Sequence, residues 1–192
     1  MPSGKTVGVL AMQGAYHKHS LMIESLGAEA LEVRTAEDMS EIDALVIPGG
    51  ESTVMSKLLA RNGLIAPLRD RALNGMPVFG TCAGMILLAK DVDDFNLPLP
   101  GLMDISVHRN AYGRQLESFE ASFSVEGLGD DPVTGIFIRA PKIIRCGPDV
   151  EILAEYEDIP VLVREKNFLA ASFHPELTGD SRIHALFLSM IK

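Results

Sequence analysis

Three residues of the sequence could together form a nucleophilic catalytic site: Cys82, His174 and Glu176. Cys82 lies in the stretch F-G-T-C-A-G (79–84), which is followed by the apolar residues 85–89. This G-x-C-x-G pattern is typical of a nucleophile elbow, a sharp turn that joins a buried strand to a helix. The free backbone N–H groups at the start of such a helix favour a thiolate. We therefore expect Cys82 to be a nucleophile.

His174 and Glu176 belong to the short segment His174-Pro175-Glu176. On extended backbone, residues i and i+2 point to the same side, so Glu176 can reach the ring of His174 and fix its tautomer. This predicts a triad in which Cys82 attacks, His174 is the general base and acid, and Glu176 orients the histidine. A cysteine before a buried helix, or an H-P-E string, is weak evidence alone, and the prediction depends on their combination.

A tetrahedral oxyanion also needs hydrogen-bond donors. The backbone N–H of Ala83 follows the nucleophile directly and is one candidate. The glycine pair Gly49-Gly50 follows an apolar run, and such a turn can direct an N–H group toward a neighbouring site. We expect the N–H of Gly50 to be the second donor.

The elements that position these residues alternate between strands and helices in the first half of the chain. Apolar runs predict strands at 7–11, 28–33, 44–47 and 78–81, and helical periodicity predicts helices at 17–26, 51–61 and 64–73 and after the elbow. This alternation predicts an α/β fold, a doubly wound, mostly parallel and flavodoxin-like sheet with helices on both faces. Because ligands bind beyond the carboxyl ends of parallel strands, the segments 12–14, 48–51 and 81–83 should converge.

The second half of the chain has a different pattern. A loop is predicted at 91–101, and short apolar or alternating runs follow at 119–125, 135–138, 142–145, 152–156, 161–164 and 168–173. We expect these runs to be antiparallel strands added to the sheet. A last helix should begin near Asp180 or Ser181 and bury one apolar face. No linker or repeat is evident, so we expect residues 1–192 to form a single domain.

Composition limits the function classes. The 192 residues carry a net charge of −9, which argues against nucleic acid as a partner. The sequence contains no run of 18 apolar residues and no signal-peptide pattern at its start, so we expect no membrane segment and a cytoplasmic protein. Cys82 and Cys146 do not form a disulfide framework. We expect His17, His19 and His184 to be solvated helix residues, and we expect no metal site and no cofactor.

Six stretches carry a resemblance to a known family. They are L-A-M-Q-G-A (10–15), P-G-G-E-S-T (48–53), F-G-T-C-A-G (79–84), R-N-A-Y-G-R-Q (109–115), F-I-R-A-P (137–141) and S-F-H-P-E-L-T (172–178). The chain resembles the class I, or triad, glutamine amidotransferases and within them the glutaminase subunits of pyridoxal 5′-phosphate synthase. The elbow and H-P-E indicate the superfamily, and the other stretches indicate the subfamily. His108 departs from the pattern, since an acidic residue is expected there.

The resemblance implies that the protein hydrolyses L-glutamine and delivers ammonia to a synthase subunit that makes pyridoxal 5′-phosphate. It also implies a glutamine pocket, formed by Gly49, Gly50, Glu51, Arg109, Ile138 and Arg139. An arginine could grip the α-carboxylate of glutamine, and Glu51 could bind its α-amino group. Gln13 could bond the Gly50 loop or face the partner subunit.

Three alternatives remain open at this point. The chain could be the glutaminase subunit of another triad amidotransferase, such as one serving imidazole-glycerol phosphate or anthranilate synthesis. It could be a Cys-elbow hydrolase of the DJ-1/protease type, although those proteins carry a histidine directly after the cysteine and here that residue is Ala83. It could also be a non-enzymatic subunit, although the three triad residues are present.

Overall fold

The computed structural model describes residues 4–109 and 118–192. Its elements are β1 (Thr6–Leu10), α1 (Tyr16–Ser25), β2 (Glu29–Val33), α2 (Ala36–Ser40), β3 (Ala44–Ile47), α3 (Ser52–Arg61), α4 (Ile65–Leu73), β4 (Val78–Thr81), α5 (Ala83–Leu88), β5 (Ala89–Val92), β6 (Met103–His108), β7 (Ser118–Phe123), β8 (Val133–Ile138), β9 (Lys142–Cys146), β10 (Glu151–Tyr156), β11 (Ile159–Glu165), β12 (Phe168–Ala171), the 3₁₀ turn η1 (Pro175–Leu177) and α6 (Arg182–Ser189).

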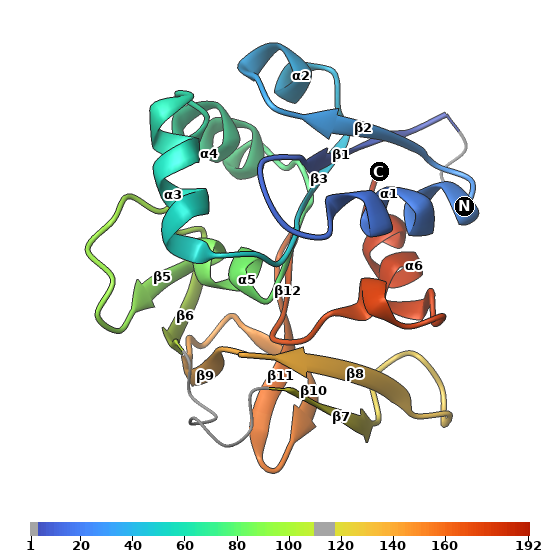
Figure 1. The fold of residues 1–192 in the computed structure, drawn as a ribbon. Coiled ribbons are helices and arrows are strands. Elements are labelled where there is room, and N and C mark those ends of the chain that lie inside the picture. The colour runs from blue at the N-terminus through green and yellow to red at the C-terminus, as the bar shows by residue number, and fades with distance from the viewer. Residues whose placement is uncertain (1–3, 110–117) are drawn as a thin grey trace.

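A seven-stranded sheet runs through the molecule in the order β10-β11-β12-β4-β3-β1-β2 (Figure 1). The strands β2, β1, β3, β4 and β12 pair in parallel, and β11 and β10 continue the sheet in antiparallel pairing. The prediction of a mostly parallel sheet with antiparallel strands added from the second half of the chain is therefore confirmed.

Each face of the sheet has its own apolar core. In β3, Leu45 and Ile47 point into one core, which includes residues of α3, α4 and α5. Ala44 and Val46 point into the other, which includes residues of α1 and α6. The alternation follows from the period of two along a strand. Helices cover both faces, as Figure 1 shows and as the sequence predicted.

The second half of the chain differs from the prediction in several respects. Strands β7 and β8 form a separate antiparallel hairpin, and β5, β6 and β9 form a separate three-stranded sheet. Strand β12 pairs with β4 in parallel, not antiparallel. The predicted loop at 91–101 begins inside β5, and α2 was not predicted. Local alternation predicts where a strand lies, but its pairing partner depends on contacts distant in the sequence.

The elbow at Cys82 joins β4 to α5 through a strained backbone. Cys82 has φ 49° and ψ −105°, a conformation that L residues rarely adopt. The flanking glycines let α5 approach the sheet: a Cβ on Gly84 would lie 2.0 Å from the carbonyl oxygen of Ile47, and one on Gly80 would lie 2.6 Å from the backbone of Gly84. The absence of side chains at Gly80 and Gly84 therefore permits the close approach of α5 to the sheet.

Replacing Gly84 with alanine tests this packing. Alanine has the higher helix propensity, so local structure alone favours Gly84→Ala. The clash with the Ile47 backbone should reverse this sign and lower the free energy of unfolding by about 2 kcal/mol or more, measured by urea denaturation. Gly179→Ala is the matched control, because a Cβ there meets no atom within 4 Å. Equal urea midpoints for the two variants would show that α5 can move away from β3 freely.

Candidate active site

The carboxyl ends of β1, β3 and β4 meet at one cavity of about 650 Å³. Its lining residues come from the segments after β1, β3, β4, β6, β8 and β12, from α3 and α5, from the start of β7 and from the end of β8: Gln13, Gly14, Gly50, Glu51, Ser52, Cys82, Ala83, Ile86, Arg109, Ser118, Ile138, Arg139 and His174. The expected convergence of the three strand ends is thus observed.

Parallel pairing of β4 with β12 brings Cys82 and His174 together. Ala171 lies opposite Thr81 in the register, and the N–H of Cys82 donates to the carbonyl oxygen of Ala171 at 2.8 Å. The chain then continues from β12 to His174, whose N–H donates to the carbonyl oxygen of Ile136 at 2.8 Å. Two residues 92 positions apart in the sequence therefore reach the same end of neighbouring strands.

Cys82 is largely buried, and its side chain points into the cavity wall formed by β8. Its Sγ lies 3.8 Å from the carbonyl oxygen of Ile138, the last residue of that strand. The next residue, Arg139, also has a positive φ, of 45°. Two non-glycine residues in left-handed backbone thus line one cavity. Such strain persists where the surrounding structure enforces it, and it is typical of functional sites.

Glu176 holds the ring of His174. The Nδ1 atom of His174 lies 2.8 Å from Oε1 of Glu176, and the carboxylate side chain is fully buried. The sequence argument placed both residues on extended backbone, but Glu176 lies in the 3₁₀ turn η1, of which Pro175 is the first residue. The turn brings the carboxylate back to the ring, so the predicted pair is present on a different local backbone.

The charges of this pair stabilise each other. Burial lowers the pKa of His174, but hydrogen bonding to Cys82 and Glu176 outweighs it and raises the pKa to about 10. Burial raises the pKa of Glu176, and this is outweighed by the hydrogen bond from His174 and by the proximity of His19, so the net shift is downward. At neutral pH the arrangement favours an imidazolium beside an ionised carboxylate.

Glycines at the cavity are required by close contacts. A Cβ on Gly49 would lie 2.3 Å from Cε1 of His174, so this residue packs behind the imidazole ring. Gly14 has φ +86°, and a Cβ there would meet the carbonyl oxygen of Gly49 at 1.7 Å.

Gln13 accepts a hydrogen bond from the N–H of Glu51 at 3.1 Å. Of its two predicted roles, the structure therefore shows contact with the Gly50 loop.

Charged side chains gather at the mouth of the cavity. The carboxylate of Glu51 caps α3 by accepting from the N–H groups of Thr53 and Val54, a role that the sequence did not indicate.

Arg109 contacts both Phe95 and Glu51. Its Cζ lies 4.9 Å from the ring centroid of Phe95, and its Nη2 lies 3.7 Å from Oε1 of Glu51. Arg109, Arg139 and Glu51 all line the cavity, as the glutamine-pocket prediction requires. The rest of the predicted stretch, 110–115, lies outside the described residues.

Two histidines were predicted wrongly. His19 and His184 are fully buried and not solvated, whereas His17 is exposed as expected. Nδ1 of His19 lies 2.9 Å from Nε2 of His184, behind Glu176. Spacing gave a signal: His19 precedes the buried Ile23 by four residues and therefore shares its helix face.

Within residues 4–109 and 118–192, no group of three or more His, Cys, Asp or Glu side chains could hold a metal ion. No helix of that same part of the chain is long and apolar enough to cross a membrane.

Comparison with known proteins matches the chain to one family. The model of the SNO glutamine amidotransferase family matches residues 9–192. The pyridoxal 5′-phosphate synthase subunit PdxT of Pelotomaculum thermopropionicum is 54% identical over 182 residues, which cover 95% of this chain and 93% of that protein. The subunit of the same name from Carboxydothermus hydrogenoformans is 50% identical over 185 residues, with coverage of 96% and 97%. A crystal structure described as a glutamine amidotransferase superposes with a TM-score of 0.92 at 48% identity, covering 96% of this chain and 98% of that one.

The buried histidines predict loss of stability in mild acid. Burial is the main cause that lowers the pKa of His19 to about 4 and that of His184 to about 3, from an ordinary 6.5. Between pH 6.5 and 4 the unfolded chain therefore binds more protons than the folded chain, and the free energy of unfolding should fall as the pH falls. His174, with its raised pKa, affects stability above pH 6.5 and does not oppose this trend.

Urea unfolding at pH 7 and pH 5 measures this effect. Each buried histidine should contribute up to about 1.4 kcal/mol per pH unit within its window. His184→Gln cannot titrate and should reduce the difference between the two pH values. His17→Gln, which replaces an exposed histidine, should keep the wild-type difference. A wild-type stability that is constant from pH 7 to pH 5 would contradict the burial of neutral imidazoles.

Proposed function

Since this chain belongs to the SNO glutamine amidotransferase family, we propose that it is the glutaminase subunit of a pyridoxal 5′-phosphate synthase. It hydrolyses L-glutamine to L-glutamate and ammonia and passes the ammonia to a separate synthase subunit. The observation that carries this proposal is the buried His174–Glu176 pair, with a 2.8 Å contact, beside Cys82 in the cavity at the strand ends. We place the reaction in the cytoplasm.

The first half of the reaction forms a thioester. The Cys82 thiolate attacks the side-chain amide carbon of glutamine, and the carbonyl oxygen becomes an oxyanion. The backbone N–H groups of Gly50 and Ala83 stabilise that charge, and both residues line the cavity beside the sulfur. The imidazolium of His174 gives its proton to the leaving nitrogen, the C–N bond breaks, and ammonia departs.

The second half regenerates the enzyme. Water attacks the γ-glutamyl thioester while Nε2 of His174 accepts a proton from it, and the C–S bond breaks to release glutamate and the thiolate. Glu176 keeps Nδ1–H of the ring bonded throughout, so Nε2 is the nitrogen that exchanges protons. The carboxylate stabilises the imidazolium in each half-reaction and does not itself exchange a proton.

Charges at the cavity mouth suit free glutamine. The α-carboxylate of the substrate can pair with the guanidinium of Arg109 or Arg139, and its α-amino group can pair with Glu51. Phe95 stacks on Arg109, which limits the freedom of the guanidinium before substrate binds. Ile138 lines the cavity, and its backbone and apolar side chain can contact the side chain of the bound glutamine.

Use of the ammonia in a synthesis requires a partner, and the relatives are named as subunits of a synthase. We propose that the synthase subunit docks near Gln13 and the loop 49–51. Gln13 already bonds the N–H of Glu51, so a shift of Gln13 on docking would reorient the Gly50 peptide. Such a movement would couple the oxyanion site to the presence of the subunit that uses ammonia.

The nucleophile is tested by Cys82→Ser. Release of glutamate from glutamine is measured with the synthase subunit added at increasing concentration. The wild-type chain should gain activity on titration, and Cys82→Ser should lose about 10³-fold or more in kcat, because His174 is a poor base for a serine hydroxyl. Cys146→Ser is the matched control and should keep its activity, since Cys146 belongs to β9, outside the cavity. A Cys82→Ser variant with a tenth of wild-type kcat would refute the assignment.

Substrate binding is tested by Arg109→Ala. Loss of an ion pair to the α-carboxylate, which is present in both ground state and transition state, should raise KM for glutamine by about tenfold or more with a small change in kcat. Arg61→Ala, at the exposed end of α3, removes the same charge away from the cavity and should leave KM unchanged. An unchanged KM in Arg109→Ala would assign Arg109 to another role.

A further inference from the structure

The triad continues into the protein interior through two histidines that the mechanism above does not use. We propose that His19 is a positioning residue of the reaction. Its Nε2–H donates a hydrogen bond to Oε2, the second carboxylate oxygen of Glu176, and His184 fixes the tautomer of His19 that carries this proton. This inference rests on the proposed function, because it concerns the same Glu176.

Glu176 presents its two oxygens to two different histidines. Oε1 faces Nδ1 of His174 at 2.8 Å, and Oε2 faces Nε2 of His19 at 3.4 Å. Oε2 makes no hydrogen bond with the described part of the chain, so the His19 contact is the interaction available to it there. A buried carboxylate oxygen without a donor is costly. Hydrogen bonds at catalytic groups are often long without substrate and tighten in the reacting complex.

The histidine pair can satisfy Oε2 in one tautomeric arrangement. His184 donates from Nε2 to Nδ1 of His19, a contact of 2.9 Å, and His19 then carries its proton on Nε2, facing Glu176 and the hydroxyl of Thr81. Nδ1 of His184, which has no partner in the described chain, is then a bare acceptor. The opposite arrangement would bury an unpaired N–H on His184 and place a lone pair of His19 against the carboxylate. The first arrangement is therefore favoured.

Neutral imidazoles are required for this chain of donors. Both rings are fully buried, and burial lowers the pKa of each, so that neither carries a charge at neutral pH. The titratable groups around Glu176 are His174 on its own segment and His19 on α1. Cys82 lies beyond His174, and His184 on α6 lies beyond His19. In this arrangement the N–H groups of His174 and His19 are directed at the carboxylate of Glu176, and that of His184 is directed at His19.

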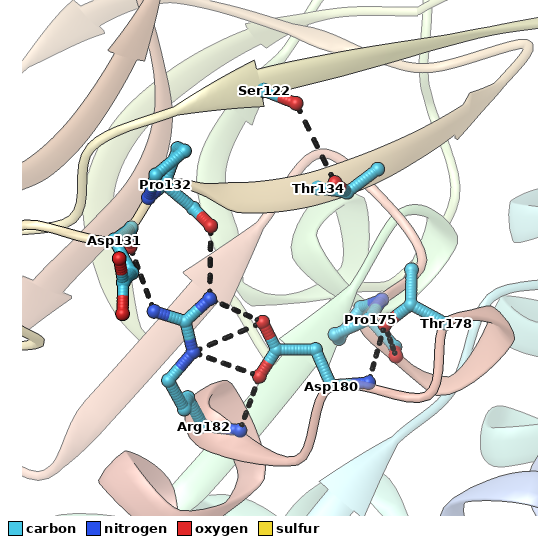
Figure 2. A network of polar contacts seen from close by, with 8 residues as sticks. All are labelled: Ser122, Asp131, Pro132, Thr134, Pro175, Thr178, Asp180 and Arg182. Carbon is cyan, nitrogen blue, oxygen red and sulfur yellow. Dashed lines mark hydrogen bonds and ion pairs between the residues drawn. The ribbon is translucent and has the colours of Figure 1, made fainter.

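The segment that carries both Glu176 and His184 is held rigidly. Figure 2 shows Thr178 bonded to the carbonyl of Pro175 and to the N–H of Asp180, at 3.0 and 3.2 Å. Arg182, the first residue of α6, pairs with Asp180 and donates to the carbonyls of Asp131 and Pro132 before β8 (Figure 2). The start of α6 is therefore tied to both η1 and the β8 hairpin, which fixes the distance from His184 to the triad.

Two substitutions at position 19 test the contributions of the two ring nitrogens of His19 separately. The amide nitrogen of glutamine can occupy the Nε2 position, so His19→Gln keeps a donor for Glu176. The shorter asparagine reaches only the Nδ1 position, so His19→Asn keeps a partner for His184 but loses the donor. His19→Asn should lower kcat about 10- to 100-fold with KM unchanged, and His19→Gln should stay within about threefold of wild type.

The pH profile distinguishes positioning from packing. Loss of a donor raises the pKa of Glu176, so the acid limb of kcat should move to higher pH in His19→Asn but not in His19→Gln. Long-range ¹H–¹⁵N NMR spectra of the wild-type protein should also show His19 protonated on Nε2. His17→Asn, on the exposed face of α1, is the matched control and should match wild type in every measurement.

The inference would be overturned if His19→Asn and His19→Gln lost kcat equally and in proportion to the fall in their urea midpoints. His19 would then be a packing residue. An Nδ1–H tautomer of His19 would overturn it as well. A failure of the proposed function would give a result distinct from these two: the wild-type protein with the synthase subunit would release no glutamate from glutamine. The NMR result does not depend on glutaminase activity.

Discussion

The left-handed backbone at Cys82 is the constraint on which the site depends. A φ of 49° is unfavourable for an L residue and persists here because both neighbours of the turn are fixed. On one side, α5 packs on β3 where Gly84 meets the carbonyl of Ile47. On the other, the N–H of Cys82 bonds to Ala171 of β12. The strain is therefore offset by sheet pairing and helix packing, which hold Cys82 at the wall of the cavity.

The same sheet pairing explains how Cys82 and His174, the proposed nucleophile and base, meet although they are distant in the sequence. β4 and β12 run in parallel with Thr81 opposite Ala171, so whatever follows each strand emerges at the same edge. Loops from β1 and β3 reach that edge too, and they fit closely because Gly14 and Gly49 have no side chains: the carbonyl of Gly49 occupies the space of a Cβ on Gly14, and the His174 ring occupies the space of one on Gly49. The cavity is thus shaped by backbone contacts, to which the charged groups of Arg109, Arg139 and Glu51 are added.

Electrostatics within the site are organised around one buried carboxylate. Glu176 is ionised in spite of its burial because His174 bonds to it, and the positive form of His174 is in turn favoured by Glu176 and Cys82. Burial also disfavours the charged forms of His19 and His184, and the attraction of Glu176 is too weak to reverse it, so both rings are neutral. Histidines in one buried cluster thus differ strongly in proton affinity, because hydrogen bonds to Cys82 and Glu176 favour the charged form of His174 alone.

By itself, the sequence located the strands of the main sheet and indicated the residues that we propose react. Periodicity located β3 and β4 to the residue, and the G-x-C-x-G and H-P-E patterns selected Cys82, His174 and Glu176, because a sharp turn and a short-range pair are local properties. Only the tertiary structure decided which strands pair, that β5, β6 and β9 leave the main sheet, that Glu51 caps α3, and that His19 and His184 are buried behind the triad. Each of these depends on contacts between residues far apart in the chain. The burial of a histidine is a clear case, because its proton affinity is set by neighbours that its own helix does not supply.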